Sequence, residues 1–310
     1  MKVVALAGGV GGAKLADGLA QILAPDALTV IVNTGDDFDH LGLHISPDLD
    51  TVCYTLAGMS NDATGWGRAD ETWQFLSTLG GLGGPTWFQL GDRDLALHHE
   101  RTRRLAAGER LSAITRDLAR RMGVKATVLP MTDDRVRTMV LTGDDELAFQ
   151  EYFVERHCEP VVRGFRFEGI ESARPADGVL EALAAADGVV LCPSNPWVSL
   201  DPILAVPGLR PALGGKVVVG VSPIIGGRAL KGPAAKMARE LGIEPAAGAV
   251  AEHFRGLLTG MVIDMEDDLE LARVEASGAR AMTARTRMTR RADRRRLADD
   301  VLHFARQLAG

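Results

Sequence analysis

The first stretch that could do chemistry is "VALAGGVGGAKL" near the N-terminus, which lies between an apolar run and a helical pattern. Glycine allows a backbone to approach a bulky ligand closely. A strand, a glycine-rich turn and a helix together direct free backbone N–H groups and the helix dipole at an anion. We therefore predict a phosphate-binding turn with the residues Gly8, Gly9, Gly11, Gly12 and Lys14.

The spacing in this stretch matches neither of two standard nucleotide-binding motifs. The dinucleotide pattern GxGxxG would need a glycine where Lys14 stands, and a Walker A loop needs a lysine followed by Ser or Thr, whereas Leu15 follows here. The prediction is therefore a phosphate-proximal turn of neither type. A tight structural turn with no ligand is the alternative.

The second candidate is the acidic segment "NTGDDFDHLGLHISPDLDT", residues 33–51. It follows a predicted strand, so its first residues belong at the carboxyl edge of the sheet, where open sheets bind ligands. Carboxylates beside a phosphate repel it unless a hard cation intervenes, and Mg²⁺ commonly uses one or two carboxylates together with phosphate oxygens. The segment predicts a metal site among its aspartates, with a solvated acidic loop as the alternative; these aspartates are Asp36, Asp37, Asp39, Asp48 and Asp50.

The segment "LGDRD", residues 90–94, allows two interpretations that the local sequence leaves open. Asp92 and Asp94 could form a salt-bridged turn that caps the following helix, because an aspartate at this position accepts backbone N–H bonds. Alternatively, Arg93 could contact an anionic or planar ligand.

Two later segments repeat the pattern of polar residues after a buried strand. In "CPSNP", residues 192–196, two prolines flank Ser194 and Asn195, whose short polar groups suit a base or a phosphate, with a plain turn as the alternative. In "GVSPIIGGRALKGPAAK", residues 220–236, Lys231 and Lys236 could neutralise phosphate charge.

Short β-branched runs and helical patterns indicate the fold that would position these residues. The runs at 2–6, 27–34, 187–195 and 216–223 are typical of strands buried on both faces of a parallel sheet. Helical patterns such as 13–23 and 177–186 lie between them. The sequence therefore predicts an α/β fold, a Rossmann-like doubly wound, mostly parallel sheet.

The rest of the chain predicts an insertion and a terminal segment. Residues 60–125 are mostly helical in pattern, and the following residues alternate like antiparallel hairpins, with "TGDD" as a turn. We predict a core from 1–59 and 176–260, an inserted α+β subdomain from 60–175, and a C-terminal helical segment from 261–310, whose arginines form a solvated helix face.

Composition excludes several classes of protein. The 310 residues carry a formal charge of −6, which argues against a nucleic-acid partner. No apolar run reaches the roughly 18–20 residues of a membrane span. The three cysteines form no CxxC pair, which fits a reducing cytoplasm. A serine hydrolase is not indicated, because no GxSxG elbow occurs.

Taken together, the motifs resemble the 2-phospho-L-lactate transferase family of deazaflavin coenzyme F-420 biosynthesis. The resemblance covers nearly the whole chain and is carried by eight blocks in the family's order: "GGVGGAK", "VNTGDD", "LGLHISPDLDT", "LGDRDLALH", "LPMTDD", "FQEYFV", "PSNPWVSLDPIL" and "VSPIIGG".

The resemblance implies transfer of a phospholactyl-type group (phospholactate, phosphoenolpyruvate or phosphoglycerate) from a donor linked to guanosine diphosphate (GDP) to the ribityl hydroxyl of the deazaflavin Fo, with Mg²⁺ required and GMP released. The sequence leaves open which of the three acids is transferred. It implies that Asp36 and Asp50 lie near the metal and the acceptor. Gln89 stands where the family pattern has a basic residue that contacts Fo. We expect Fo over the 33–51 loop and the 87–93 segment, with Trp87 or Phe88 close to its ring. The resemblance also implies a homodimer.

Two alternatives come from other classes of protein. A non-catalytic regulator that binds a nucleotide or sugar nucleotide would share the fold and part of the opening stretch, although "SPDLDT" and "LGDRD" argue against it. An NAD-dependent dehydrogenase is disfavoured by the imperfect GxGxxG and by the acidic cluster.

Overall fold

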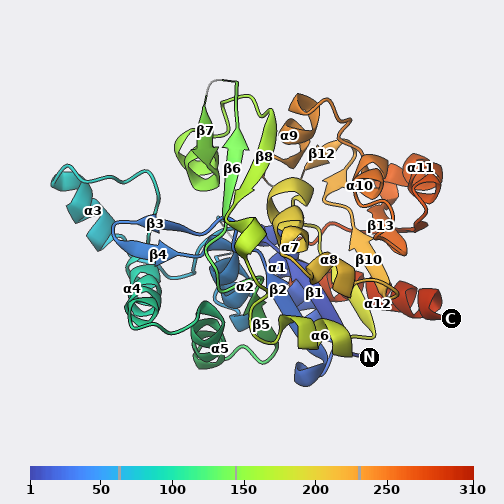
Figure 1. Cartoon of the computed structure of the whole chain (residues 1–310), viewed down its shortest axis with the longest axis horizontal. Helices are drawn as coiled ribbons and strands as arrows, with labels where there is room; N and C mark the ends of the chain where they lie inside the picture. The colour runs from blue at the N-terminus through green and yellow to red at the C-terminus, as the bar shows by residue number, and fades with distance from the viewer. Residues whose placement is uncertain (62–63, 144, 230–231) are drawn as a thin grey trace.

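The central element of the protein is a seven-stranded parallel sheet in the order β14-β13-β10-β9-β1-β2-β5 (Figure 1). The computed structural model describes residues 1–61, 64–143, 145–229 and 232–310. The strands of this sheet are β1 (Val3–Ala7), β2 (Leu28–Val32), β5 (Thr127–Pro130), β9 (Gly188–Leu191), β10 (Val217–Val221), β13 (Gly260–Asp264) and β14 (Arg280–Ala284).

Helices cover both faces of the sheet. The helices of the described chain are, in chain order, α1 (Gly9–Ala20), α2 (Pro47–Ala57), α3 (Gln74–Gly81), α4 (Asp92–Ala106), α5 (Leu111–Arg121), α6 (Val179–Ala185), α7 (Asp201–Ala205), α8 (Leu209–Ala212), α9 (Ala234–Glu240), α10 (Ala247–His253), α11 (Leu271–Ala276) and α12 (Arg291–Ala309). In the described part of the chain no helix is long and apolar enough to cross a membrane.

The two faces of the sheet form two hydrophobic clusters, because successive side chains of a strand point to opposite sides. Val4 and Leu6 of β1 belong to one cluster, and Val3, Ala5 and Ala7 belong to the other. Helices α1 and α12 pack together in the second cluster. This double burial explains why β1 is apolar at all five positions.

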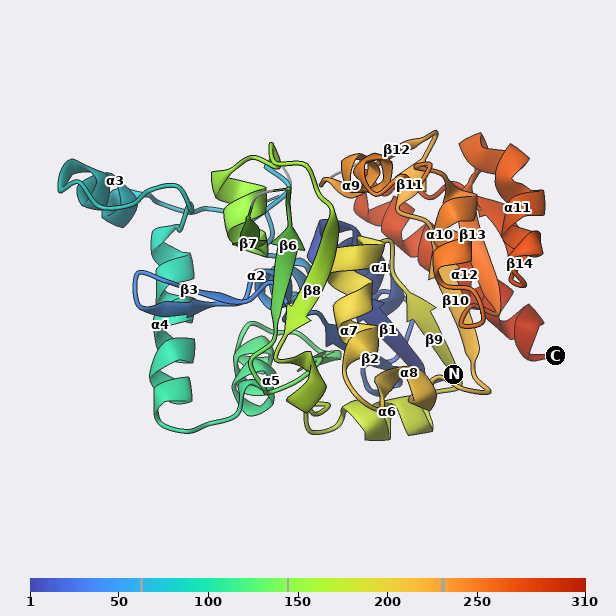
Figure 2. The ribbon, with the colours of Figure 1, turned by 45° about the horizontal axis from the view of Figure 1, so that its top comes forward.

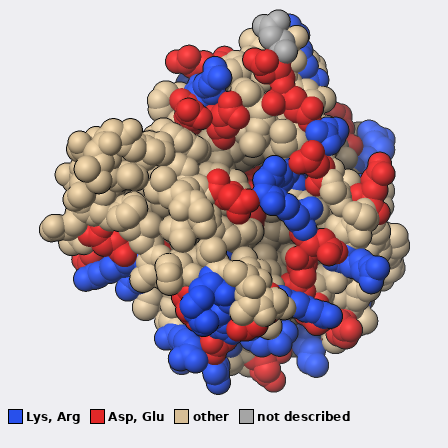
Figure 3. All heavy atoms as spheres, turned by 60° about the vertical axis from the view of Figure 1, so that its left-hand side comes forward, with Lys and Arg blue, Asp and Glu red and all other residues tan. Residues whose placement is uncertain are grey.

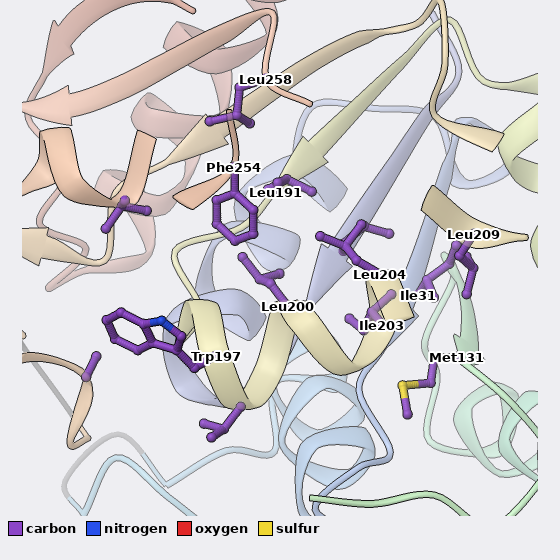
Figure 4. Close-up of a cluster of buried hydrophobic side chains, with 14 of the residues drawn as sticks. Ile31, Met131, Leu191, Trp197, Leu200, Ile203, Leu204, Leu209, Phe254 and Leu258 are labelled. Atoms are coloured by element: carbon purple, nitrogen blue, oxygen red, sulfur yellow. The ribbon is translucent and has the colours of Figure 1, made fainter. Parts of the chain in front are cut away.

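A helical segment that starts at Pro196 and continues into α7 packs over the first cluster. Figure 4 shows Leu200, Ile203 and Leu204 of this segment with Leu191 of β9 in the same cluster. This packing fixes the chain directly after β9, and that chain contains two of the predicted site residues.

Smaller antiparallel sheets lie beside the central sheet. They are the hairpin β3 (Phe38–His40) and β4 (Leu43–Ile45), the three strands β6 (Arg137–Leu141), β7 (Glu146–Ala148) and β8 (Gly164–Glu168), and the pair β11 (Ile224–Ile225) and β12 (Arg228–Ala229). Figure 2 shows α3, α4 and the β3–β4 hairpin together on one side of the molecule.

The predicted fold class and the four predicted core strands are confirmed. The predicted hairpin pattern is found in β6, β7 and β8, and the backbone N–H of Thr142 donates to the carbonyl of Asp145 across the "TGDD" turn. Asp144 of this turn lies outside the described residues.

Three expectations need correction. Helix α1 begins at Gly9, so most residues of the predicted glycine-rich turn belong to the first turns of this helix. Strand β5, inside the predicted insertion at 60–175, belongs to the central sheet, as do β13 and β14 in the predicted helical segment 261–310. β5 and β14 are the edge strands and have exposed positions, so they lack the continuous apolar run of a central strand, whereas β13 is buried at all five positions.

The arginines of the C-terminal helix also differ from the predicted solvated face. Arg294 is buried, and its guanidinium lies 3.3 Å from a carboxylate oxygen of Asp17, while the exposed Arg291 lies 3.2 Å from the other oxygen. Part of the arginine run therefore joins α12 to α1.

Candidate active site

The predicted phosphate turn and the predicted Ser194 segment meet at the point where the strand order reverses. Strand β1 has β2 on one side and β9 on the other, so the carboxyl ends of all three strands surround one crevice. The backbone N–H of Gly8 donates to Oγ of Ser194 at 3.0 Å, and the Ser194 hydroxyl donates to the Gly8 carbonyl at 2.8 Å. Asn195 caps the helical segment after β9, accepting the backbone N–H of Trp197 at 3.0 Å.

Gly11 and Gly12 of α1 lie against the chain that follows β9, where no larger side chain fits. A Cβ on Gly11 would overlap the carbonyl oxygen of Pro193, and one on Gly12 would lie 2.5 Å from Oγ of Ser194. Gly9 differs, because its φ of +61° favours glycine, while a Cβ there would make only an ordinary contact with Oδ1 of Asp48 at 3.8 Å. Protein atoms therefore fill the space beside Gly11 and Gly12 that a phosphate was expected to use.

This packing leads to a prediction for Gly11→Ala. We expect the change to destabilise the protein by about 1–3 kcal/mol, because the added methyl group overpacks a site already filled by backbone. Thermal unfolding measures it. Gly81→Ala is the matched control, since no atom lies within 4 Å of its Cβ position in α3. Weaker GDP binding by Gly11→Ala at an unchanged melting temperature would contradict the steric explanation and favour a phosphate cradle.

Asp48, at the start of α2, links the glycine loop to the end of β2. One carboxylate oxygen accepts the backbone N–H of Gly9 at 2.7 Å, and the other accepts Nδ2 of Asn33 at 2.9 Å. Asn33 in turn accepts the backbone N–H of Gly35 at 2.8 Å. Burial raises the pKa of Asp48 to about 6 despite these donors. The sequence placed Asp48 in the acidic cluster but gave no sign of its contact with Gly9.

Asp36 lies in the same buried cluster and has unused hydrogen-bonding capacity. Its pKa is raised well above the usual range, first by burial and then by the neighbouring Asp48 carboxylate. Four buried oxygens of this region have no hydrogen-bond partner among the described residues: Thr34 Oγ1, Asp36 Oδ1, Asp37 Oδ1 and Thr138 Oγ1. Buried, unpaired acceptors of this kind are costly, so the cluster is chemically incomplete without a proton, a cation or a ligand.

Asp50, the second predicted metal ligand, has different partners from Asp36. Both of its carboxylate oxygens contact the guanidinium of Arg101 on α4, one of them at 3.1 Å from Nη1. Nδ1 of His98 lies 3.5 Å from Asp50 Oδ2, and burial lowers the pKa of His98 to about 4. The structure thus makes Asp50 part of a buried ion pair that joins α2 to α4, and metal binding by Asp50 stays a prediction.

Two acidic residues, Asp92 in the segment 90–94 and Glu71 before α3, each cap the helix that the other adjoins. Asp92 accepts the backbone N–H groups of Gln74 and Phe75 at the start of α3, at 3.1 and 3.0 Å. Glu71 accepts the backbone N–H groups of Arg93 and Asp94 at the start of α4, at 2.9 and 3.0 Å. Asp92 therefore caps the preceding helix rather than its own. The side chains of Arg93 and Gln89 are exposed, and their contacts with a ligand stay predictions.

Two lysines considered for phosphate binding contact protein groups instead. Lys14 donates to the Met288 carbonyl at 3.1 Å. Lys236 donates to Glu240 at 2.7 Å and to Tyr152 Oη at 3.2 Å. Lys231 lies outside the described residues. In the part of the chain that the structure describes, no group of three or more His, Cys, Asp or Glu residues could hold a metal ion.

Comparison with known proteins shows where this architecture belongs. The family model described as 2-phospho-L-lactate transferase CofD matches residues 3–302. The chain belongs to this family. It is 48% identical to a phosphoenolpyruvate transferase from Streptomyces griseus over 93% of both chains, and 41% identical to a 2-phospho-L-lactate transferase from Methanopyrus kandleri over 100% of this chain and 99% of the other.

A solved structure extends the likeness to the fold. A protein of the UPF0052 family from Bacillus halodurans matches with a TM-score of 0.64 and 17% identity, over 97% of this chain and 98% of that chain. At this identity the likeness shows the fold alone. CofD membership identifies the chain as a transferase of the phosphoenolpyruvate and phospholactate type and implies a place in coenzyme F-420 biosynthesis.

In this CofD-family chain a cluster of four rings adjoins the acidic loop. Phe38 and His40 of the β3 strand pack with Trp87 and Phe88, with ring centroids 4.8 Å apart for Phe38–Phe88 and 5.0 Å apart for His40–Trp87. The buried Nε2 of His40 has no hydrogen-bond partner among the described residues. The sequence drew attention to Trp87 and Phe88, whereas the aromatic residues of the hairpin were missed, although Phe38 and His40 alternate as on one face of a strand.

Proposed function

We propose that the chain transfers a phosphoenolpyruvyl group from a guanosine diphosphate-linked donor to the ribityl hydroxyl of the deazaflavin Fo, with release of GMP. The observation that carries the proposal is the meeting of Gly8, Ser194 and the Asp36–Asp48 cluster at the sheet's switch point, in a chain of the CofD family. Phosphoenolpyruvate is preferred over phospholactate and phosphoglycerate because the relatives at 45–48% identity are named phosphoenolpyruvate transferases.

The residues around Asp36 fit the Mg²⁺ that the family implies. Their metal-donor atoms are carboxylate and hydroxyl oxygens, which suit a hard cation, and Oδ1 of Asp36 is buried with no hydrogen-bond partner among the residues described. We propose that Asp36 holds the ion, with Asp48 beside it. Metal binding by Asp50 stays a prediction, because both of its carboxylate oxygens contact Arg101. Substrate phosphates and water would complete the coordination. When bound, Mg²⁺ would neutralise the charge of the donor's diphosphate.

In the proposed mechanism the protein positions the two substrates and accepts a proton from the acceptor hydroxyl. The acceptor hydroxyl oxygen forms a bond to the distal phosphorus of the donor while the bond from that phosphorus to the GMP oxygen breaks. An aspartate of the cluster other than the one that holds the ion orients the hydroxyl and takes its proton. Burial raises the pKa of Asp48 to about 6, and a raised pKa makes a carboxylate a better base. No covalent enzyme intermediate is needed, because transfer of this kind rests on positioning and charge stabilisation.

The test is the mass of the product. Purified protein is incubated with Fo, Mg²⁺ and each of the three GDP-linked donors in turn. We expect the Fo adduct of phosphoenolpyruvate to form fastest, together with one GMP for each adduct. A non-catalytic regulator, which would share the fold, would bind nucleotide and form no adduct with any donor.

The aromatic cluster gives a separate prediction for Fo binding. We propose that the planar ring of Fo lies against Trp87 and Phe88, so Fo fluorescence should change on titration with micromolar protein. Trp87→Ala should weaken binding about tenfold, because an aromatic contact contributes about 0.5–1.5 kcal/mol beyond its buried area. Phe153→Ala removes an exposed ring outside the cluster and serves as the control. Unaltered Fo affinity in Trp87→Ala would move the acceptor site elsewhere.

A homodimer is also part of the proposal, and α3 offers a surface for it. Helix α3 buries none of its residues, and Trp73, Phe75 and Leu82 on or beside it are exposed. Figure 3, which brings this side of the molecule forward, shows a broad area without charged residues. Exposed apolar patches of this kind often mark interaction sites. Sedimentation of the wild type and of Phe75→Glu would test the assembly.

A further inference from the structure

A large hollow in the surface lies at the opposite edge of the sheet from the candidate active site. This cavity of about 990 Å³ is lined by three loops that lead into the amino ends of β10, β13 and β14. The loop residues fall within 210–216, 255–259 and 276–280, and Leu308 of α12 forms another part of the wall. Its size is that of a small-molecule site. No residue discussed for the transfer reaction contributes to it.

The lining of this cavity is cationic although the whole chain is acidic. Among the described residues its charged side chains are Arg210, Lys216, Arg255 and Arg280, and none of the Asp or Glu residues described lines it. The chain as a whole carries a formal charge of −6. Cations gathered in a concave surface reinforce one another's field and attract anions.

Three of these four cationic side chains have no hydrogen-bond or ion-pair partner among the described residues. Lys216 donates to the carbonyls of Ala186 and Ala184 at 3.1 and 3.3 Å, so its ammonium group lies at the C-terminal end of α6. In the described ranges, by contrast, Arg210, Arg255 and Arg280 form no side-chain hydrogen bond or ion pair. The nearby carboxylate of Glu252 is held by Arg273 at 3.0 Å.

The backbone around the cavity leaves room for a ligand. Gly215, Gly256 and Gly278 each adopt a positive φ, and no atom lies within 4 Å of any of their Cβ positions. The three turns therefore have open space beside them, in contrast to the packed glycines of the active-site loop.

We propose that this cavity binds an oligophosphate, either inorganic or part of a nucleotide. Guanidinium groups suit phosphate because they donate two parallel hydrogen bonds to its oxygens. Three arginines from three different segments of the chain (Arg210 in α8, Arg255 after α10 and Arg280 at the start of β14) can surround a chain of several phosphates, whereas a ligand with a single carboxylate would pair with only one of them. The inference does not depend on the transferase reaction.

Calorimetric titration with tripolyphosphate tests the proposal. We expect the wild type to bind, with an affinity that falls as salt increases. The double variant Arg255→Gln/Arg280→Gln should bind at least about tenfold more weakly, because each lost charged hydrogen bond contributes about 1.5–3 kcal/mol. Arg116→Gln/Arg163→Gln is the matched control, since it removes the same charge from exposed positions outside the cavity.

Two results would overturn the proposal: no binding by the wild type at low salt, or equal binding by the wild type and the Arg255/Arg280 variant. A parallel titration with ATP identifies the source of the phosphates. Tighter binding of ATP than of tripolyphosphate would indicate a nucleotide, and equal binding would indicate that the phosphates alone are recognised.

Discussion

Replacing Asp36 with asparagine is expected to abolish transfer and to leave the fold intact. Asparagine has nearly the same shape, so packing around the buried side chain is preserved. The change alters a buried carboxyl group whose Oδ1 has no hydrogen-bond partner in the described part of the chain. Supporting groups of a metal site already contribute about 10–100-fold to affinity or activity, and a direct ligand contributes more.

Product formation at several Mg²⁺ concentrations, together with circular dichroism and thermal unfolding, measures this effect. The melting temperature should stay the same or rise, because a buried, unpaired carboxylate is unfavourable. Asp39→Asn is the matched control, since Asp39 lies in the adjacent strand β3 with its carboxylate half exposed and paired with Arg135. Full activity of Asp36→Asn at low Mg²⁺ would remove Asp36 from the metal site.

Asp50→Asn is expected to lower both activity and stability. The sequence predicts a metal ligand whose replacement spares the fold, but the structure places both Asp50 oxygens on the buried guanidinium of Arg101. Removing one partner of a buried ion pair leaves the other uncompensated and costs about 3–5 kcal/mol. Chemical denaturation measures this loss directly.

A compensating variant separates the two roles of Asp50. Asp50→Leu/Arg101→Met replaces the pair by apolar side chains, and such replacements are often neutral or stabilising. We expect this double variant to recover most of the stability that Asp50→Asn loses. If it also recovers activity, Asp50 acts only by joining α2 to α4; if it stays inactive, Asp50 or Arg101 contributes to the reaction. A native melting temperature for Asp50→Asn would contradict the ion-pair interpretation.

Local sequence patterns determined the fold class and the four core strands. Strands such as β1 and β10 are buried on both faces, so nearly every position is apolar. Such a run can be recognised without knowing which strands lie beside it. The same patterns placed Gly8, Asn33 and Ser194 after strands, and a parallel sheet brings the carboxyl ends of its strands to one edge. The location of the candidate site therefore followed from the sequence alone.

Tertiary structure decided which partner each of these residues has. Asp50 meets Arg101, Gly8 meets Ser194 and Asp92 caps α3, in each case because packing brings together residues that are distant in the chain. The glycines after β1 could be read as a phosphate turn, yet the structure shows Gly11 and Gly12 packed against residues 193–194. A sequence shows which side chains are small, acidic or basic, and whether a given space is filled by protein or left open is settled only by the packing of separate elements.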